Sequence, residues 1–198
     1  ANPYLLCFNN YVVDFKNKSY RKGRPDDFIS KSTNIDYIPY NNLKGTCSRQ
    51  NKKYKYESII QEIEKFMDEL FPNPELKKYM WQHLASVLIG TNENQTFNIY
   101  TGSGANGKSK LVEFMAKCLG DYKATVPITL ITQSRNTIGS TSSEIVQLMG
   151  VRYAVMQEPS KGDKINEGIM KEITGGDPIQ GRSLYSDTVT YVPQFSLC

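Results

Sequence analysis

The sequence predicts an α/β fold, which we expect to be incomplete at its C-terminal end and preceded by a small α+β and helical region. From residue 97 onward, short apolar runs alternate with stretches of helical periodicity, which is typical of an α/β domain. A glycine-rich loop joins one of these runs to a helix, whereas residues 1–49 are rich in Tyr, Asn, Asp and Lys. We therefore expect three parts: residues 1–55, a helical pair over residues 56–92, and the α/β part over residues 93–198.

The composition is that of a folded protein without a membrane segment. Of the 198 residues, 39% are hydrophobic and 22% are charged, and no apolar stretch approaches the ~20 residues that a transmembrane helix needs. No charged-then-apolar leader follows Ala1, so we expect a signal peptide to be absent or already removed. The formal net charge of +4 suits an anionic partner without requiring one.

The four cysteines predict neither a zinc site nor a disulfide framework. Cys7, Cys47, Cys118 and Cys198 form no C-x-x-C pair, and we expect the single histidine, His83, to lie far from all of them. Structural zinc sites need clustered ligands, and disulfide frameworks belong to shorter, cysteine-dense chains. A reducing, intracellular compartment is therefore expected.

The N-terminal part predicts short strands. Apolar residues 5–8 and 11–13 suit two strands joined by a turn at Asn9 and Asn10, and residues 24–27 predict another turn. A basic run with interleaved tyrosines follows over residues 49–56. Such a run suits either contact with nucleic acid, through stacking and phosphate pairing, or a solvated linker.

Two helices are predicted next. The first covers about residues 58–71, where apolar residues recur at helical spacing before Pro72. In the second, Asn73 is the expected N-cap, Pro74 suits the first helical position and Gly90 the C-terminal cap. The apolar face of this second helix is predicted to contain Leu76, Tyr79, Met80, Leu84, Val87 and Leu88.

A phosphate-binding loop is the strongest single motif. Residues 97–100 predict a short buried strand that runs into G-x-x-x-x-G-K-[ST], and the helix that follows ends at Gly120. Inward-pointing N–H groups and a helix N-terminus bind phosphate, Lys108 reaches the β- and γ-phosphates, and Ser109 ligates Mg²⁺. ATP and Mg²⁺ are therefore the expected cofactors, and the residues expected to bind the nucleotide are Gly102, Ser103, Gly104, Ala105, Asn106, Gly107, Lys108 and Ser109.

An acidic residue is expected beside this loop. Residues 151–157 predict a buried strand whose carboxyl end carries Glu158. In phosphate-loop folds such a carboxylate holds the Mg²⁺ water shell and polarises the attacking water. We therefore predict Lys108 and Glu158 as catalytic residues, with Ser109 and Glu158 as the metal site.

A short helix ending at Gly175-Gly176 is followed by a predicted hairpin with its return strand at residues 188–192. Its loop carries Arg182, Leu184 and Tyr185, which suit contact with a DNA backbone and a base. A surface hairpin packed on its own domain is the alternative.

At this point the chain resembles a known family. GSGANGKS at 102–109, MQEP at 156–159 and KEITGGD at 171–177, with RSLY at 182–185, resemble the D5-type primase-helicases of nucleocytoplasmic large DNA viruses. FNNYVVDF at 8–15 is similar to the D5 N-terminal region, so the resemblance covers nearly the whole chain. It implies a P-loop NTPase core of the AAA+-like, superfamily 3 helicase type, assembled as hexameric rings around DNA. It also implies that Lys171 reaches the neighbouring subunit's nucleotide, that residues 182–186 grip DNA, and that the protein acts in the host cytoplasm or a viral replication factory.

Two departures from the family pattern matter. Gln157 precedes a single Glu158, where many members carry two acidic residues. Residues 192–198 look like the fourth core strand, which in this fold lies between the phosphate-loop strand and the Glu158 strand, and the sensor and arginine finger are expected beyond Cys198. We accordingly expect the 198-residue piece to be unstable or to aggregate alone.

The leading functional hypothesis is an ATP-hydrolysing DNA helicase motor of a viral replication primase-helicase. One alternative is a P-loop phosphotransferase, which would need an arginine-rich lid, although Arg135 is the only arginine between Lys108 and Arg152. The other is a nucleotide-binding, DNA-binding or oligomerisation module without turnover. Primase activity resides upstream in relatives and is not assigned to these residues.

Overall fold

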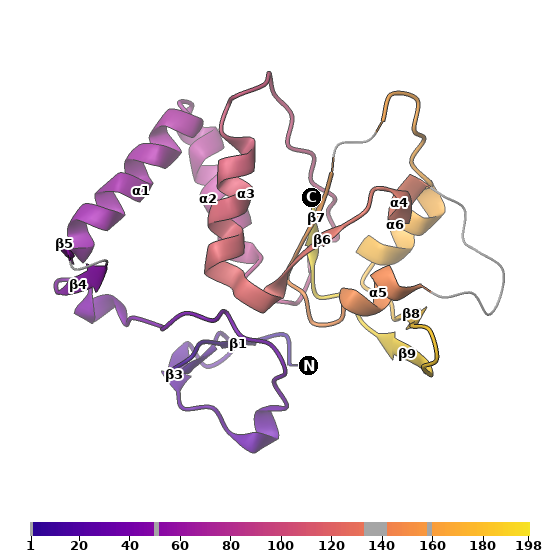
Figure 1. Ribbon diagram of the computed structural model, residues 1–198, viewed down its shortest axis with the longest axis horizontal. Helices are drawn as coiled ribbons and strands as arrows, with labels where there is room; N and C mark the ends of the chain where they lie inside the picture. Colours follow the sequence, from indigo (N-terminus) through magenta and orange to yellow (C-terminus); the bar gives the residue numbers. More distant parts are fainter. Residues whose placement is uncertain (1, 50–51, 133–141, 158–159) are drawn as a thin grey trace.

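A computed structural model describes residues 2–49, 52–132, 142–157 and 160–198 (Figure 1). Its centre is a parallel sheet of β6 (Lys123–Val126), β7 (Tyr153–Met156) and β10 (Ser196–Leu197), in the order β10-β7-β6. Phe97 adds a parallel bridge to Leu197 on the open side of β10. Residues 192–198 therefore do supply a strand between Phe97 and β7, as predicted.

Helices cover both faces of this sheet, which confirms the α/β class. On one face lie α1 (Tyr56–Leu70), α2 (Pro74–Ser86) and α3 (Lys108–Leu119), and on the other α4 (Thr129–Thr132), α5 (Ser143–Gln147) and α6 (Glu167–Thr174). Side chains alternate along β7 accordingly: Tyr153 packs with Met67, Leu84 and Leu111, whereas Ala154 packs with Ile131, Ile173 and Leu197. Two apolar cores thus sandwich one sheet.

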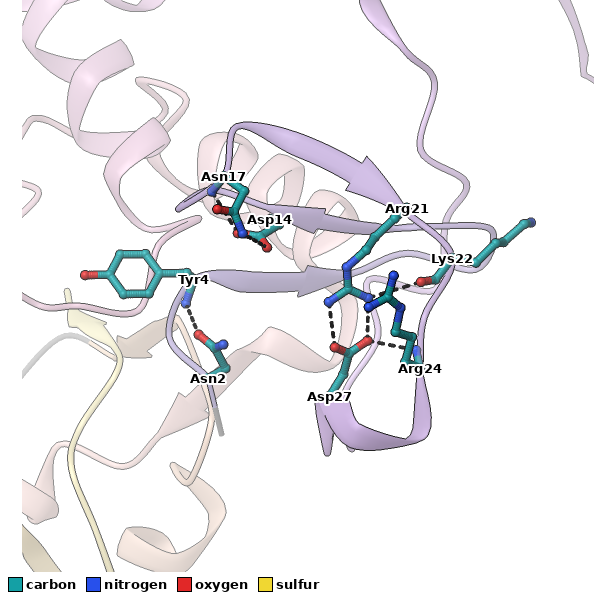
Figure 2. Close-up of polar contacts among 8 residues, drawn as sticks. All are labelled: Asn2, Tyr4, Asp14, Asn17, Arg21, Lys22, Arg24 and Asp27. Atoms are coloured by element: carbon teal, nitrogen blue, oxygen red, sulfur yellow. Dashed lines mark hydrogen bonds and ion pairs between the residues drawn. The ribbon is translucent and has the colours of Figure 1, made fainter.

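The N-terminal part folds as a small antiparallel sheet, β1 (Leu5–Cys7), β2 (Val12–Asp14) and β3 (Ser19–Arg21). A one-turn helix at Pro25–Asp27 confirms the predicted turn. Figure 2 shows the ion pair that attaches this turn to β3, with Arg21 Nη2 2.6 Å from Asp27 Oδ1. The Arg21 guanidinium is the main reason that the pKa of Asp27 falls to about 2.

A buried arginine joins this small sheet to the main sheet. Arg152, which begins the chain's path into β7, has a fully buried side chain that donates to the backbone carbonyls of Pro3 and, at 3.0 Å, Leu5. Burial lowers the pKa of Arg152 to about 10. The Tyr122 hydroxyl accepts from Cys7 N at 3.1 Å and donates to Lys31 O at 3.0 Å. These contacts connect residues 91 to 149 positions apart in the sequence.

The basic tyrosine run is a hairpin and not a linker. β4 (Thr46–Arg49) pairs antiparallel with β5 (Lys52–Lys55), in the register Cys47↔Tyr54. A one-turn helix at Tyr40–Asn42 precedes it, and α1 follows it directly. Tyr56 N donates to Gly45 O at 3.2 Å, which closes the base of the hairpin. The described residues of the run are therefore paired strands, and whether they contact nucleic acid or only connect the N-terminal part to α1 stays open at this point.

The second predicted helix is partly corrected. Asn73 Oδ1 accepts from Glu75 N at 2.9 Å and Leu76 N at 3.1 Å, so the N-cap is confirmed. The helix ends at Ser86, however, and Gly90 is not its cap. A Cβ at Gly90 would lie 2.3 Å from Arg152 Nη1, so glycine there makes room for the buried guanidinium. Leu76 and Tyr79 are exposed and do not belong to the buried face, whereas Met80 and Leu84 of α2 and Val87 just after it are buried in the core.

Two smaller expectations were wrong. Residues 97–100 do not form a buried strand: the pairing stops near Phe97, where β10 ends, and Ile99 is 67% exposed. His83 is also not remote from the cysteines, because the fold brings Cys198 Sγ within 4.0 Å of His83 Nε2. All four cysteines are free in this structure. In the described part of the chain, no helix combines the length and the apolarity that crossing a bilayer requires.

Candidate phosphate site and exposed hairpin

The glycine-rich loop lies where the sequence predicts it, between Phe97 and α3. Figure 1 shows the chain arching over the end of α3 before it enters that helix at Lys108. The first hydrogen bond of the helix runs from Leu111 N to Gly107 O at 3.0 Å. The N–H groups of Lys108, Ser109 and Lys110 therefore have no helical acceptor, which leaves the positive end of the helix dipole at the loop.

Three positions explain the loop's glycines and its curl. Gly107 has φ +84° and Ala105 has φ +60°, both left-handed, and alternation of right- and left-handed residues turns successive N–H groups toward one concave side. A Cβ at Gly107 would lie 2.8 Å from Leu70 Cδ1, so the end of α1 packs directly against the loop. A Cβ at Gly102 would lie 2.0 Å from Asn106 Nδ2. These positions cannot carry larger side chains without moving their neighbours.

Lys108 folds back over the loop that precedes it. Its Nζ donates to Gly102 O at 3.0 Å and to Asn106 Oδ1 at 2.8 Å. The ammonium thus spans the loop's concave side, within reach of an anion held by the backbone. Ser103, Gly104 and Ser109 are exposed around it, and nothing lies within 4 Å of a Cβ built at Gly104.

The parallel sheet brings the loop and the carboxyl end of β7 to one edge. Because Phe97, β10 and β7 are mutually parallel, the chain leaves Phe97 and Met156 in the same direction. Gln157 is the last described residue on that path. Glu158 lies outside the described residues, so its assignment to the metal site stays a prediction.

Lys171 lies on the other face of the sheet from α3. It is exposed in the last turn of α6, whose Ile169 and Ile173 are in the core with α4 and α5. In the described ranges, no hydrogen bond or ion pair joins Lys171 to residues 102–109. Its predicted catalytic role toward a neighbouring subunit is untested by this arrangement.

The predicted exposed hairpin is present. β8 (Ile179–Arg182) pairs with β9 (Thr188–Tyr191), and the turn end of β8 is attached to the start of α5, because Arg182 N donates to Ser142 Oγ at 3.0 Å. Arg182 Nε donates to Ser186 O at 3.1 Å across the turn. Leu184 is 66% exposed and Tyr185 is 95% exposed, the latter with a left-handed φ of +59°. The tip therefore presents an apolar and an aromatic side chain to solvent.

Sequence reasoning missed a partly buried polar cluster around Tyr100, two residues before the loop. His83 Nε2 lies 2.7 Å from the hydroxyl of Tyr100, which receives a hydrogen bond from Tyr153 at 3.3 Å. Cys198 Sγ lies 3.6 Å from the same hydroxyl. Burial raises the pKa values of Tyr100, Tyr153 and Cys198 and lowers the pKa of His83, so all four groups are neutral near pH 7. No local pattern reveals the cluster, because its members come from four separate segments.

A groove of about 540 Å³ lies away from the loop. It runs between α2, the segment after it and the start of β10, and its lining includes His83, Thr96 and Ser196. Ser196 begins β10 and Thr96 precedes the bridge at Phe97, whereas the glycine-rich loop follows Phe97 on its carboxyl side. The groove is therefore separate from the phosphate site.

Comparison with known proteins agrees with this picture. A family model described as "D5 N terminal like" matches residues 1–84. A "putative helicase" of Acanthamoeba polyphaga mimivirus is 37% identical over 194 residues, covering 98% of this chain and 19% of that protein. A "putative helicase" of Invertebrate iridescent virus 3 is 28% identical over 200 residues, covering 99% of this chain and 20% of that protein. A "putative primase" of African swine fever virus is 23% identical over 187 residues, covering 93% and 18% respectively.

The chain thus spans about a fifth of the length of these relatives. The D5 N-terminal match extends through α1 and into α2, beyond residue 55. Residues 1–84 thus match the D5 N-terminal-like family model, and nearly the whole chain is similar to one part of much longer putative helicases and a putative primase of large DNA viruses.

Proposed function

We propose that residues 93–198 are the phosphate-binding part of an ATP-driven DNA helicase motor in a D5-type replication primase-helicase. The observation that carries the proposal is the position of the loop at residues 102–109. The loop leads into the N-terminus of α3 and lies at one edge of the parallel sheet. The carboxyl end of β7 points toward the same edge. This is the placement that phosphoryl transfer requires of a phosphate loop and an acidic strand.

The residues present fit a nucleoside triphosphate. The open space at Gly104 and the left-handed conformations of Ala105 and Gly107 are consistent with a backbone that curls around a phosphate. Lys108 is positioned to exchange its contacts with Gly102 O and Asn106 Oδ1 for phosphate oxygens. Ser109 would ligate Mg²⁺, which when bound supplies positive charge at the β- and γ-phosphates. Glu158 is proposed to complete the metal site.

The β8–β9 hairpin is the proposed DNA contact of the motor. Tyr185 offers a nearly free ring for stacking on a base, and Arg182 offers a charge for the sugar-phosphate backbone. The helicase and primase names of the relatives support DNA as the partner. We propose that identical subunits form a ring, six in the family pattern, in which Lys171 contacts the nucleotide of the neighbouring subunit. The proposed location of the protein is the host cytoplasm or a viral replication factory.

Unwinding of a forked DNA duplex by the full-length natural protein tests this function. We expect ATP-dependent strand separation that Tyr185→Ala reduces at least tenfold and Tyr185→Phe largely retains, because stacking needs the ring and not the hydroxyl. Transfer of phosphate from ATP to a small molecule without any unwinding would favour the phosphotransferase alternative. Nucleotide and DNA binding without turnover would favour a binding module.

A further inference from the structure

Positive charge is concentrated in one segment of the N-terminal domain. Between Tyr37 and Tyr56 the sequence has five basic residues and no acidic one: Lys44, Arg49, Lys52, Lys53 and Lys55. That is one positive charge more than the formal net charge of the whole chain, +4. The excess of basic residues in the protein is therefore accounted for by the β4–β5 hairpin and the turn before it.

The hairpin presents this charge together with aromatic rings. Lys53 and Lys55 are exposed and point to one face of β5, because side chains alternate along a strand. Tyr54, on the other face, is 41% exposed, and Tyr40 in the preceding turn is 83% exposed. Lys44, two residues before β4, is also exposed. Cations flanking accessible aromatic rings are the combination that binds single-stranded nucleic acid without base readout.

The helix after the hairpin has the opposite charge. The exposed acidic residues of α1 outnumber its single lysine, Lys65: they are Glu57, Glu62, Glu64, Asp68 and Glu69. A polyanion would be repelled along α1 and attracted only at its N-terminal end. The charge distribution thus confines an anionic strand to the hairpin.

The position of the hairpin separates it from the motor site. Figure 1 shows β4 and β5 at the outer end of α1. The other end of α1 packs on the phosphate loop through Leu70 and Gly107. A helix of 15 residues with a rise of 1.5 Å per residue holds the two sites about 22 Å apart.

We infer that the β4–β5 hairpin, with Lys44 and Tyr40 in the turn before it, is a binding site for single-stranded nucleic acid. Lysines contact phosphates and the tyrosines stack on bases, at a fixed distance from the phosphate loop. This contact is additional to the β8–β9 hairpin and does not depend on ATP. It therefore survives if the proposed motor function fails.

Fluorescence anisotropy of the full-length natural protein with fluorescein-labelled 20-nucleotide oligo(dT), without nucleotide, tests the site. Lys53→Gln with Lys55→Gln removes two phosphate contacts and leaves the backbone pairing intact. We expect weaker binding and a dependence of log K on log[salt] that is shallower by about 1.4, since each contact to a single strand contributes about 0.7. The matched control is Lys16→Gln with Lys18→Gln, two exposed lysines near the β2–β3 turn, with an expected change in slope near zero.

The aromatic part of the site has its own test. Tyr54→Ala is expected to weaken oligo(dT) binding fivefold or more, whereas Tyr54→Phe retains it. Oligo(U) of the same length shows whether the site takes RNA as well as DNA. An unchanged salt slope in the Lys53/Lys55 variant, or equal losses in both lysine pairs, overturns the proposal, as does full binding by Tyr54→Ala. Far-UV circular dichroism and a matching melting temperature confirm that each variant is folded.

Discussion

Replacing Arg152 with methionine should loosen the N-terminal domain from the sheet. The side chain is 1% exposed, pairs with no acidic side chain in the described part of the chain, and donates to the carbonyls of Pro3 and Leu5. Pro3 O keeps a second donor, Gly90 N at 2.9 Å, so the orphaned acceptor is mainly Leu5 O. An unsatisfied buried carbonyl costs about 1–3 kcal/mol, and a hydrogen bond from a charged donor contributes about 1.5–3 kcal/mol.

Burying the charged guanidinium costs desolvation free energy, as its lowered pKa indicates. Methionine removes that cost, which offsets part of the lost hydrogen bonding. We expect a net destabilisation of about 3 kcal/mol, which for a chain of this size lowers the melting temperature by about 6–12 °C. Differential scanning calorimetry measures that shift, and limited proteolysis should cut residues 1–49 faster in the variant. The exposed control Arg24→Met is expected within about 0.5 kcal/mol of the parent.

An equal or higher melting temperature for Arg152→Met would refute this reasoning. It would mean that the desolvation cost of burying the guanidinium exceeds the stabilisation from its hydrogen bonds, as happens for some buried ion pairs.

Three further predictions follow from the same structure. Gly90→Ala should destabilise the parent because its Cβ meets the guanidinium at 2.3 Å, and should cost clearly less in an Arg152→Met background; additive losses by thermal melting would argue against that contact. Asn73→Ala should cost about 1 kcal/mol through the lost N-cap, and no change on urea denaturation would contradict it. Asp27 has a folded pKa of about 2, below the ordinary 3.8, so its stabilisation is present above about pH 4 and is lost as the pH falls toward 2. Asp27→Asn should reduce the dependence of the free energy of unfolding on pH between about 4 and 2. An unchanged dependence would show that the ion pair with Arg21 contributes nothing to stability.

Local signals in the sequence predicted the elements that rest on local chemistry. Asn73 and Pro74 fix the start of α2, Gly107 and Gly120 bound α3, and the Gly175-Gly176 turn precedes the β8–β9 hairpin. The parallel strand at β10 could be placed only through the family resemblance, because periodicity does not identify a two-residue strand. These elements also position the loop residues, so much of the candidate phosphate site was predictable.

The wrong expectations concern contacts between distant segments. Gly90 suits a helix cap by its sequence, yet the constraint on it is the guanidinium of Arg152, sixty-two positions later. Arg152 itself suits a surface position by residue type, and only the carbonyls of residues 3 and 5 explain its burial. The run at residues 49–56 has too few apolar residues to indicate a strand, and its pairing is set by the register with residues 46–49.

The hydrolysis of ATP by the full-length natural protein, with and without single-stranded DNA, tests the central claim most directly. Lys108→Ala should abolish turnover, because no other described side chain spans the loop from Gly102 to Asn106. Lys110→Ala, which removes an exposed lysine paired with Glu113 on the same helix, should retain it. DNA-stimulated turnover that depends on Lys108 and not on Lys110 is the predicted result. Turnover that persists in Lys108→Ala, or that does not respond to DNA in the unchanged protein, would contradict the assignment of this loop to an ATP-driven DNA motor.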